Sequence, residues 1–131
     1  MLAVDTNVVV RYLTGDDPAQ AEVARKLVAN HPILLLQTVM LETEWVLRSM
    51  YGFPRSEVGN GLRAFAQLRT VNVQEPVQVW QALDWFATGM DFADALHLAI
   101  AGATDCDAFA TFDRKFVAAA RKSKAGKVKA L

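Results

Sequence analysis

The sequence has few of the residues on which several common kinds of protein depend. It contains a single cysteine, Cys106, so no disulfide can form within the chain, which leaves the compartment open but fits a reducing cytoplasm. It contains two histidines, His31 and His97, so histidine-rich zinc sites and Ser-His-Asp triads have little to build from. We interpret His97 as a core histidine or as one that supports a neighbouring site residue.

Long apolar runs are also missing. The apolar run at residues 33–36 is far shorter than the roughly 20 residues that a membrane-spanning helix needs, and no basic region precedes an apolar core at the N-terminus. We therefore expect a soluble cytoplasmic protein with no membrane partner. A chain of 131 residues, 53% of them hydrophobic, can bury one core but is too short for two ordinary domains, so we expect one domain over residues 1–131.

The net charge is zero, but the basic residues are unevenly distributed. Residues 1–113 hold all 14 acidic residues and 7 of the 14 basic ones, whereas the last 18 residues hold the other 7 basic residues and no acid. A basic tail beside an acidic body suits a polyanion that is guided toward a metal-bearing site. A solvated tail that aids solubility explains the same pattern equally well.

Short apolar segments with strand character alternate with segments of helical periodicity. We predict strands at residues 2–4, 33–36, 71–73 and 108–111. We predict helices over residues 8–13, 18–30, 38–51, 55–68, 76–88 and 91–104, and a last helix from residue 113. Asp17 and Thr38 are the expected N-caps of the second and third helices. Such alternation predicts an α/β fold with a mainly parallel sheet covered on both faces.

Two aspartates come soon after predicted strands. Asp5 follows the strand at residues 2–4, and Asp113 follows the strand at residues 108–111. Binding sites in parallel sheets form beyond the carboxyl ends of the strands, so one crevice could receive both residues. An aspartate between a strand and a helix is also a common N-cap, and for either residue taken alone the cap is slightly the better explanation.

Glu42 and Glu44 lie two residues apart on the helix predicted over residues 38–51. Apolar neighbours one turn from Glu42, such as Trp45, predict a partly enclosed position for its side chain. Glu44 precedes Arg48 by four residues, which predicts a surface ion pair. A carboxylate on a buried face needs a cation, a metal or a proton, so we predict a functional role for Glu42, with a buried ion pair as the alternative.

Asp94 falls in the first turn of the helix predicted from Asp91. An acid at this position suits the helix dipole and can close a capping box, which is a purely structural explanation. Leu98 and Ala101 follow Asp94 at the spacing of one helix face, which directs Asp94 along the side that faces the core. This second observation favours a site residue.

Four acids in one cleft would repel each other strongly unless a divalent cation were present. Oxygen ligands alone select hard ions, Mg²⁺ or Mn²⁺, over zinc. Such a metal binds phosphodiester oxygens and lowers the pKa of a bound water, which is the chemistry of metal nucleases and phosphatases.

Four motifs, taken together, resemble those of the PIN-domain family. They are VDTN at residues 4–7, LETEWVL at 41–47, DFADAL at 91–96 and ATFDRKF at 110–116. The similarity spans essentially the whole chain, and within the family it is greatest to the VapC toxins of bacterial toxin–antitoxin pairs. The resemblance implies a PIN-like α/β/α sandwich with a small, mainly parallel central sheet, Mg²⁺-dependent cleavage of an RNA substrate, a homodimer and inhibition by a cognate antitoxin.

The resemblance also implies roles for individual residues. It assigns the catalytic acids to Asp5, Glu42, Asp94 and Asp113. Asp5 and Asp94 are the implied ligands of Mg²⁺, which Mn²⁺ can replace. Asn7 and Thr111 match polar positions that flank such sites. Asp91, one helical turn from Asp94, is a further acid whose part stays open.

Two other functions fit parts of the pattern. A haloacid-dehalogenase-like phosphatase also has an aspartate after its first strand, but it needs a second aspartate two residues later, where this chain has Asn7. A PIN-like interaction module without activity would carry the same acids as caps and surface charges. Metal titration separates this module from a nuclease, because the module shows neither a Mg²⁺-dependent change in melting temperature nor cleavage of RNA.

Overall fold

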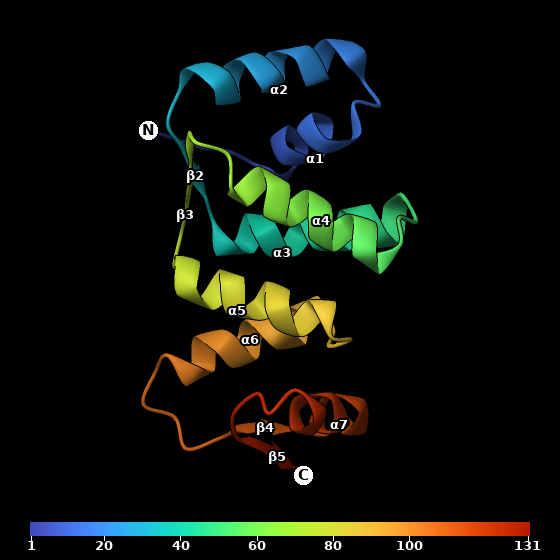
Figure 1. Cartoon of the computed structure of the whole chain (residues 1–131), viewed down its shortest axis with the longest axis vertical. Coiled ribbons are helices and arrows are strands. Elements are labelled where there is room, and N and C mark those ends of the chain that lie inside the picture. Colours follow the sequence, from blue (N-terminus) through green and yellow to red (C-terminus); the bar gives the residue numbers. More distant parts are fainter. The chain divides into compact units, whose positions relative to one another are not determined.

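The computed structural model describes residues 1–131 and consists of two compact units, Met1–Glu75 and Pro76–Leu131 (Figure 1). The first unit contains β1 (Leu2–Ala3), α1 (Thr6–Thr14), α2 (Pro18–Asn30), β2 (Ile33–Leu35), α3 (Gln37–Trp45), the π-helical turn η1 (Val46–Met50), α4 (Arg55–Ala66) and β3 (Val71–Val73). The second contains α5 (Pro76–Ala87), α6 (Phe92–Gly102), β4 (Phe109–Thr111), α7 (Arg114–Lys122) and β5 (Val128–Ala130). None of the helices combines the length and the apolar character needed to cross a membrane.

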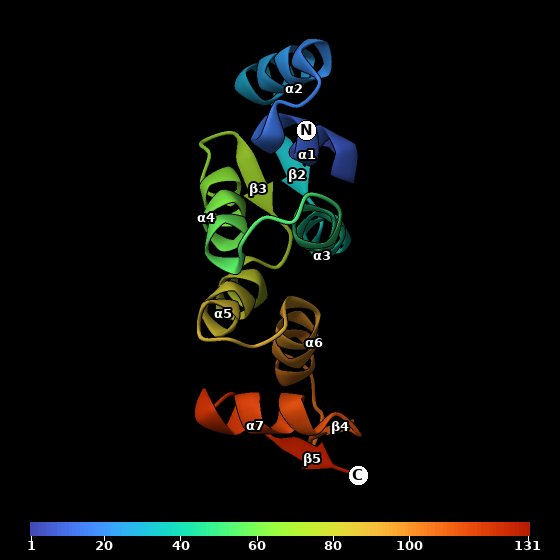
Figure 2. The same ribbon diagram turned by 90° about the vertical axis from the view of Figure 1, so that its right-hand side faces the viewer.

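The first unit is built around a three-stranded parallel sheet with β2 at its centre (Figure 2). Ile33 of β2 lies opposite Leu2 of β1 on one side and Val71 of β3 on the other. The side chains of Ile33 and Leu35 are fully buried, because helices connect each strand to the next and cover the short strands. A central strand this apolar is expected where both faces of a sheet are enclosed.

Local signals in the sequence explain where the first two helices begin and end. Gly15 ends α1 in the left-handed region at φ 65°, and its N–H donates to the carbonyl of Arg11 at 3.0 Å. Asp17 caps α2, since its Oδ1 accepts from the N–H of Gln20 at 3.1 Å, and Pro18 occupies the first helical position. The bounds predicted for the helix over residues 18–30 are confirmed.

The start of α3 differs from the prediction. Thr38 is not the N-cap, because the helix begins one residue earlier, at Gln37, and no side chain of its own cap residue closes it. The amide of Gln74, just beyond β3, accepts from the N–H of Gln37 at 3.0 Å instead. A side chain 37 residues away in the sequence therefore caps the helix, which no local pattern could reveal.

The second unit combines two packed helices with a two-stranded parallel sheet. α5 and α6 pack side by side, with the rings of Phe86 and Phe92 meeting edge to face at 5.6 Å (Figures 1 and 2). β4 pairs with β5, and α7 connects the two strands. The ring of Phe116 on α7 packs against Phe109 of β4 at 5.3 Å. β5 was not predicted from the sequence. It lies within the last 18 residues, so part of the basic tail belongs to this sheet.

The observed elements confirm the α/β class and the parallel strands. Each strand predicted from a short apolar run is present, and the helices predicted over residues 55–68, 76–88 and 91–104 are found at nearly the same bounds. The single domain expected from the chain length stays a prediction.

Candidate active site

Asp5 stands between β1 and α1 in the first unit. Its side chain is exposed, and its Oδ1 accepts from the N–H of Asn7 at 2.7 Å, which makes it the N-cap of α1. The capping role expected for this position is therefore real. One carboxylate oxygen takes part in this bond, so the cap does not exclude a further task for the other oxygen.

The structure reverses the environments predicted for Glu42 and Glu44. Glu42 is exposed on α3, whereas Glu44 is only 1% exposed. The expected partner of Glu44 is correct, since its Oε2 accepts from Nε of Arg48 at 2.7 Å, but this ion pair is partly buried and does not lie on the surface. The prediction of an enclosed Glu42 was wrong.

The reason for the reversal is the phase of α3. Its buried side chains include Met40, Thr43, Glu44 and, in the following turn, Leu47. Trp45, which suggested an apolar face beside Glu42, is 51% exposed. The buried positions 40, 43, 44 and 47 recur at α-helical spacing, so the buried face runs through Glu44 and not through Glu42.

Two carboxylates of the second unit act on a third, that of Asp94. Asp94, in the first turn of α6, is half-buried, and this burial raises the pKa of its carboxyl group, with further contributions from the negative charges of Asp91 and Asp113. His97, one turn further along α6, acts in the opposite direction. The second unit thus brings together two of the four predicted catalytic acids, with Asp91 beside them.

Backbone hydrogen bonds hold two of these carboxylates at helix N-termini. Asp91 caps α6, with its Oδ2 accepting from the N–H of Asp94 at 3.2 Å. Oδ1 of Asp113 accepts from the N–H groups of Lys115 at 2.9 Å and Phe116 at 3.2 Å and so caps α7. The hydroxyl of Thr111 accepts from the N–H of Asp113 at 3.0 Å, so this polar flanking residue orders the turn that carries the acid.

His97 does not lie in the core. Its side chain is exposed, and its ring stacks on that of Phe109 with 6.5 Å between the ring centroids. The interpretation of His97 as a core histidine was therefore wrong, while its proximity to Asp94 agrees with a supporting position.

The chemistry of the second-unit acids fits a hard divalent cation. Asp94 and Asp113 offer only carboxylate oxygens, which Mg²⁺ and Mn²⁺ prefer, and burial followed by the negative charges of Asp91 and Asp113 raises the pKa of Asp94. Neither unit by itself gathers three His, Cys, Asp or Glu side chains closely enough to hold a metal ion. Asp5 and Glu42 belong to the first unit, and Asp94 and Asp113 belong to the second.

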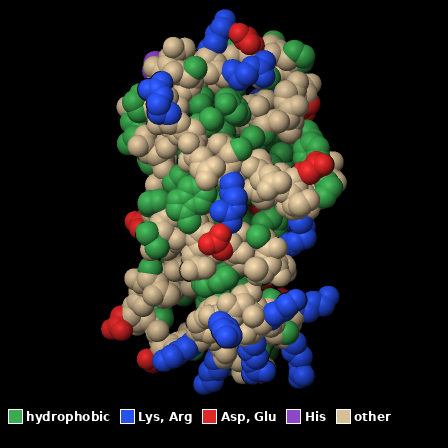
Figure 3. Space-filling view, in the orientation of Figure 1, with side chains coloured by type: hydrophobic (Ala, Val, Ile, Leu, Met, Phe, Trp, Pro, Cys, Tyr) green, Lys and Arg blue, Asp and Glu red, His purple; other side chains and the backbone are tan.

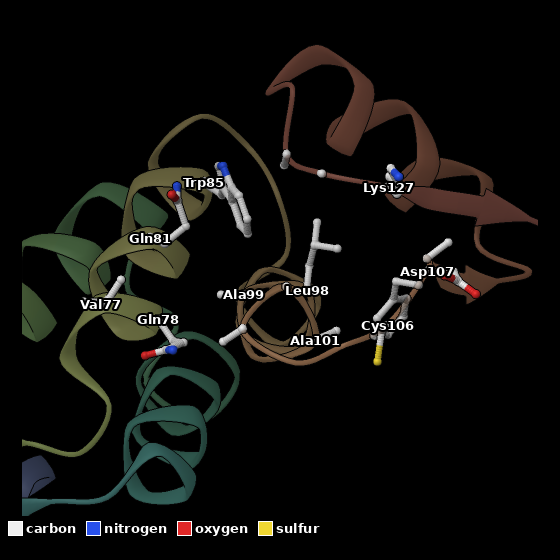
Figure 4. A pocket seen from close by; sticks show the side chains of 16 residues that line it. Val77, Gln78, Gln81, Trp85, Leu98, Ala99, Ala101, Cys106, Asp107 and Lys127 are labelled. Carbon is white, nitrogen blue, oxygen red and sulfur yellow. The ribbon is translucent and has the colours of Figure 1, made fainter.

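A pocket within the second unit is a different feature. It has a volume of about 460 Å³ and lies among α5, α6 and the segments before β4 and β5, where Trp85 and Leu98 flank it (Figure 4). Asp107 and Lys127 are its charged lining residues, and none of the three interacting aspartates lines it. Most of the lining is small and apolar, so this pocket does not offer the carboxylates that metal-dependent chemistry needs.

Comparison with known proteins identifies one family. The model of the PIN domain matches residues 2–122. Among solved structures, VapC20 of Mycobacterium tuberculosis, described as a toxin that cleaves the sarcin–ricin loop, is similar, with 22% sequence identity, a TM-score of 0.44, and coverage of 91% of this chain and 95% of that one. No curated protein matches the chain.

Proposed function

Because the chain belongs to the PIN domain family, we propose that it is a divalent-metal-dependent endoribonuclease, the toxin of a toxin–antitoxin pair, which acts in the cytoplasm. The observation that carries this proposal is the group of Asp91, Asp94 and Asp113 in the second unit, where burial and neighbouring negative charges raise the pKa of Asp94. Carboxylates in excess favour a divalent cation, which in turn attracts the phosphodiester backbone of RNA.

We assign the catalytic acids to Asp5, Glu42, Asp94 and Asp113. Asp5 and Asp94 would hold Mg²⁺, for which Mn²⁺ can substitute. When bound, the metal supplies Lewis-acid chemistry toward a phosphodiester oxygen and a water molecule. Glu42 is exposed on α3, so its carboxylate can accept a proton from an attacking water. The two backbone bonds to Oδ1 of Asp113 fix this carboxylate relative to α7.

The test is cleavage of RNA by purified protein that is free of any inhibitor. We expect cuts at few positions with Mg²⁺ or Mn²⁺ and none with EDTA, because every assigned acid offers only oxygen ligands. Asp94→Asn should abolish cleavage, while the matched control Asp105→Asn, which changes an exposed acid of the same unit, should leave it intact. Cleavage that persists undiminished in EDTA contradicts the metal mechanism. No cleavage and no Mg²⁺-dependent rise in melting temperature would favour the non-catalytic module.

We further propose that the protein forms a homodimer and binds a cognate antitoxin. The support is exposed apolar surface, since Trp45 is 51% exposed and Met50 is 70% exposed in the turn that follows it. We expect the antitoxin to place a basic side chain against the carboxylates and a short apolar helix in a groove. Expression from the native locus tests this, because a protein that stays monomeric at high concentration and co-purifies with nothing contradicts both partners.

A further inference from the structure

One face of α7 and the ends of the neighbouring strands form a second, smaller groove in the second unit. Its volume is about 330 Å³, and α7 lines it with Arg114, Val117, Ala118 and Arg121. These four residues have the spacing i, i+3, i+4 and i+7 and therefore share one face of the helix. Phe112, Ala130 and Leu131 complete the lining.

Phe112 is the most exposed large apolar side chain of the protein, with 83% of its surface accessible. It lies between Thr111, the last residue of β4, and Asp113, the cap of α7. A ring left in water contributes nothing to a core, so the folded state gains little from it. Its position is better explained by contact with something outside the chain.

The surroundings of the groove are strongly basic. Seven Lys and Arg residues and no acidic residue follow Asp113 in the sequence, and Figure 3 shows basic side chains gathered over α7, β4 and β5. Arg114 and Arg121 are both exposed on the groove face, two helical turns apart, which separates them by roughly 10 Å along the axis. An occupant of this groove should therefore carry several negative charges and a flat apolar group.

We propose that this groove binds a nucleotide of single-stranded RNA, with a base stacked on Phe112 and backbone phosphates on Arg114 and Arg121. Aromatic stacking combined with a positively charged groove is the usual way in which proteins hold single strands, and it tolerates any base. The proposal rests on the proposed nuclease function, because Phe112 directly precedes Asp113, which we assign as a catalytic acid. The groove would then hold a nucleotide beside the phosphodiester that is cut.

Binding of a short, fluorescently labelled single-stranded RNA of mixed sequence tests the groove, measured by anisotropy with Mg²⁺. Each protein carries Asp94→Asn so that the RNA stays intact. Phe112→Ala should raise the Kd about fivefold or more, which corresponds to about 1 kcal/mol of lost stacking, and Phe112→Trp should restore binding. Because Phe112 is exposed, neither change should disturb folding.

The salt dependence of the same binding tests the arginines. For a single strand, log Kobs falls with log salt by about 0.7 for each phosphate that is neutralised, so Arg121→Gln should reduce the slope by about 0.7. Lys122→Gln is the matched control, since it removes one exposed charge of α7 that does not line the groove. Its slope and its Kd should stay close to those of the parent protein.

The outcomes separate this proposal from the nuclease itself. If a protein with Asp94 intact cleaves RNA, but Phe112→Ala changes neither binding nor cleavage, the groove proposal is overturned and the nuclease stands. If RNA binding depends on Phe112 but no variant cleaves, the groove stands and the nuclease is overturned. If Phe112→Ala weakens self-association in sedimentation and leaves RNA binding unchanged, the groove is an interface between copies of this chain, which overturns the proposal.

Discussion

Glutamine substitutions at two neighbouring acids of α3 should act on different properties: Glu44→Gln should lower stability, and Glu42→Gln should lower activity. Glu44 is 1% exposed, and both of its carboxylate oxygens accept from Arg48, at 2.7 and 3.4 Å. Glu44→Gln keeps the shape but removes the buried negative charge that faces Arg48. Removing one partner of a fully buried ion pair costs about 3 to 5 kcal/mol.

The side chain of Arg48 is 36% exposed, so water compensates part of this loss, and we expect about 2 kcal/mol for Glu44→Gln. A chain of this length loses about 3 to 5 °C in Tm per kcal/mol, which predicts a fall of about 6 to 10 °C by calorimetry. Glu42→Gln should leave Tm nearly unchanged, because its side chain is exposed. Glu42→Gln should lower the rate of RNA cleavage by about 100-fold or more, because we assign Glu42 to accept the proton from water.

Glu22→Gln is the matched control for burial. Glu22 pairs with Arg25 and Lys26, both at 3.5 Å, but its side chain is 55% exposed, so the substitution should cost less than about 1 kcal/mol. An equal fall in Tm for Glu44→Gln and Glu22→Gln would refute the reasoning from burial. Full cleavage by Glu42→Gln would refute the role given to Glu42.

Two further substitutions test charged side chains, Asp94 in the second unit and Asp16 in the first. Asp94→Asn should hold or raise Tm in EDTA, because burial and the charges of Asp91 and Asp113 raise the pKa of Asp94 and so disfavour its ionised form. The same substitution should reduce the stabilisation that Mg²⁺ gives. A loss of about 0.3 to 1 kcal/mol with or without metal, together with intact cleavage, would mean that Asp94 only complements the helix dipole. The pKa of Asp16 is lowered by the hydrogen bond from Tyr51, and further by those from Thr14 and Arg11 and by the charge of Arg11. The ionised form of Asp16 therefore stabilises the fold above pH about 4, and this stabilisation is lost as pH falls through the lowered pKa. Asp16→Asn should therefore lower Tm at neutral pH, and its difference from wild type should shrink in melts below pH about 4; a difference that stays constant with pH would contradict this linkage.

Sequence patterns predicted the elements whose signals are local. Asp17 followed by Pro18 marked the start of α2, and the apolar run from Ile33 marked the central strand. Asp91 and Asp113 cap helices at the predicted places. In each case the residues that determine the element lie within it or directly beside it, so the prediction needed no knowledge of distant contacts.

The errors have two other causes, which are dependence on distant partners and an apolar side chain that the fold leaves exposed. β5 offers only Val128 and Ala130 as apolar residues, with lysines at positions 127 and 129, and it becomes a strand because it pairs with β4. The N–H of Gln37, at the start of α3, donates to the side chain of Gln74, which lies just beyond β3. The phase of Glu42 and Glu44 was misjudged because the exposed Trp45 resembles a core residue in sequence.

The π-helical turn η1 also determines how the first unit tolerates changes in chain length. Such a turn holds one residue more than an α-helical turn, and here the N–H of Tyr51 donates to the carbonyl of Val46, five residues earlier, at 3.2 Å. Loss of one residue within the turn would let the same N–H and carbonyl pair at α-helical spacing, so the residues after the turn would keep their orientation. Tyr51 would stay where its hydroxyl donates to Asp16 at 2.5 Å and accepts from Arg11. The first unit should therefore tolerate loss of one residue here better than loss of one residue within α3, which would rotate everything that follows by about 100°.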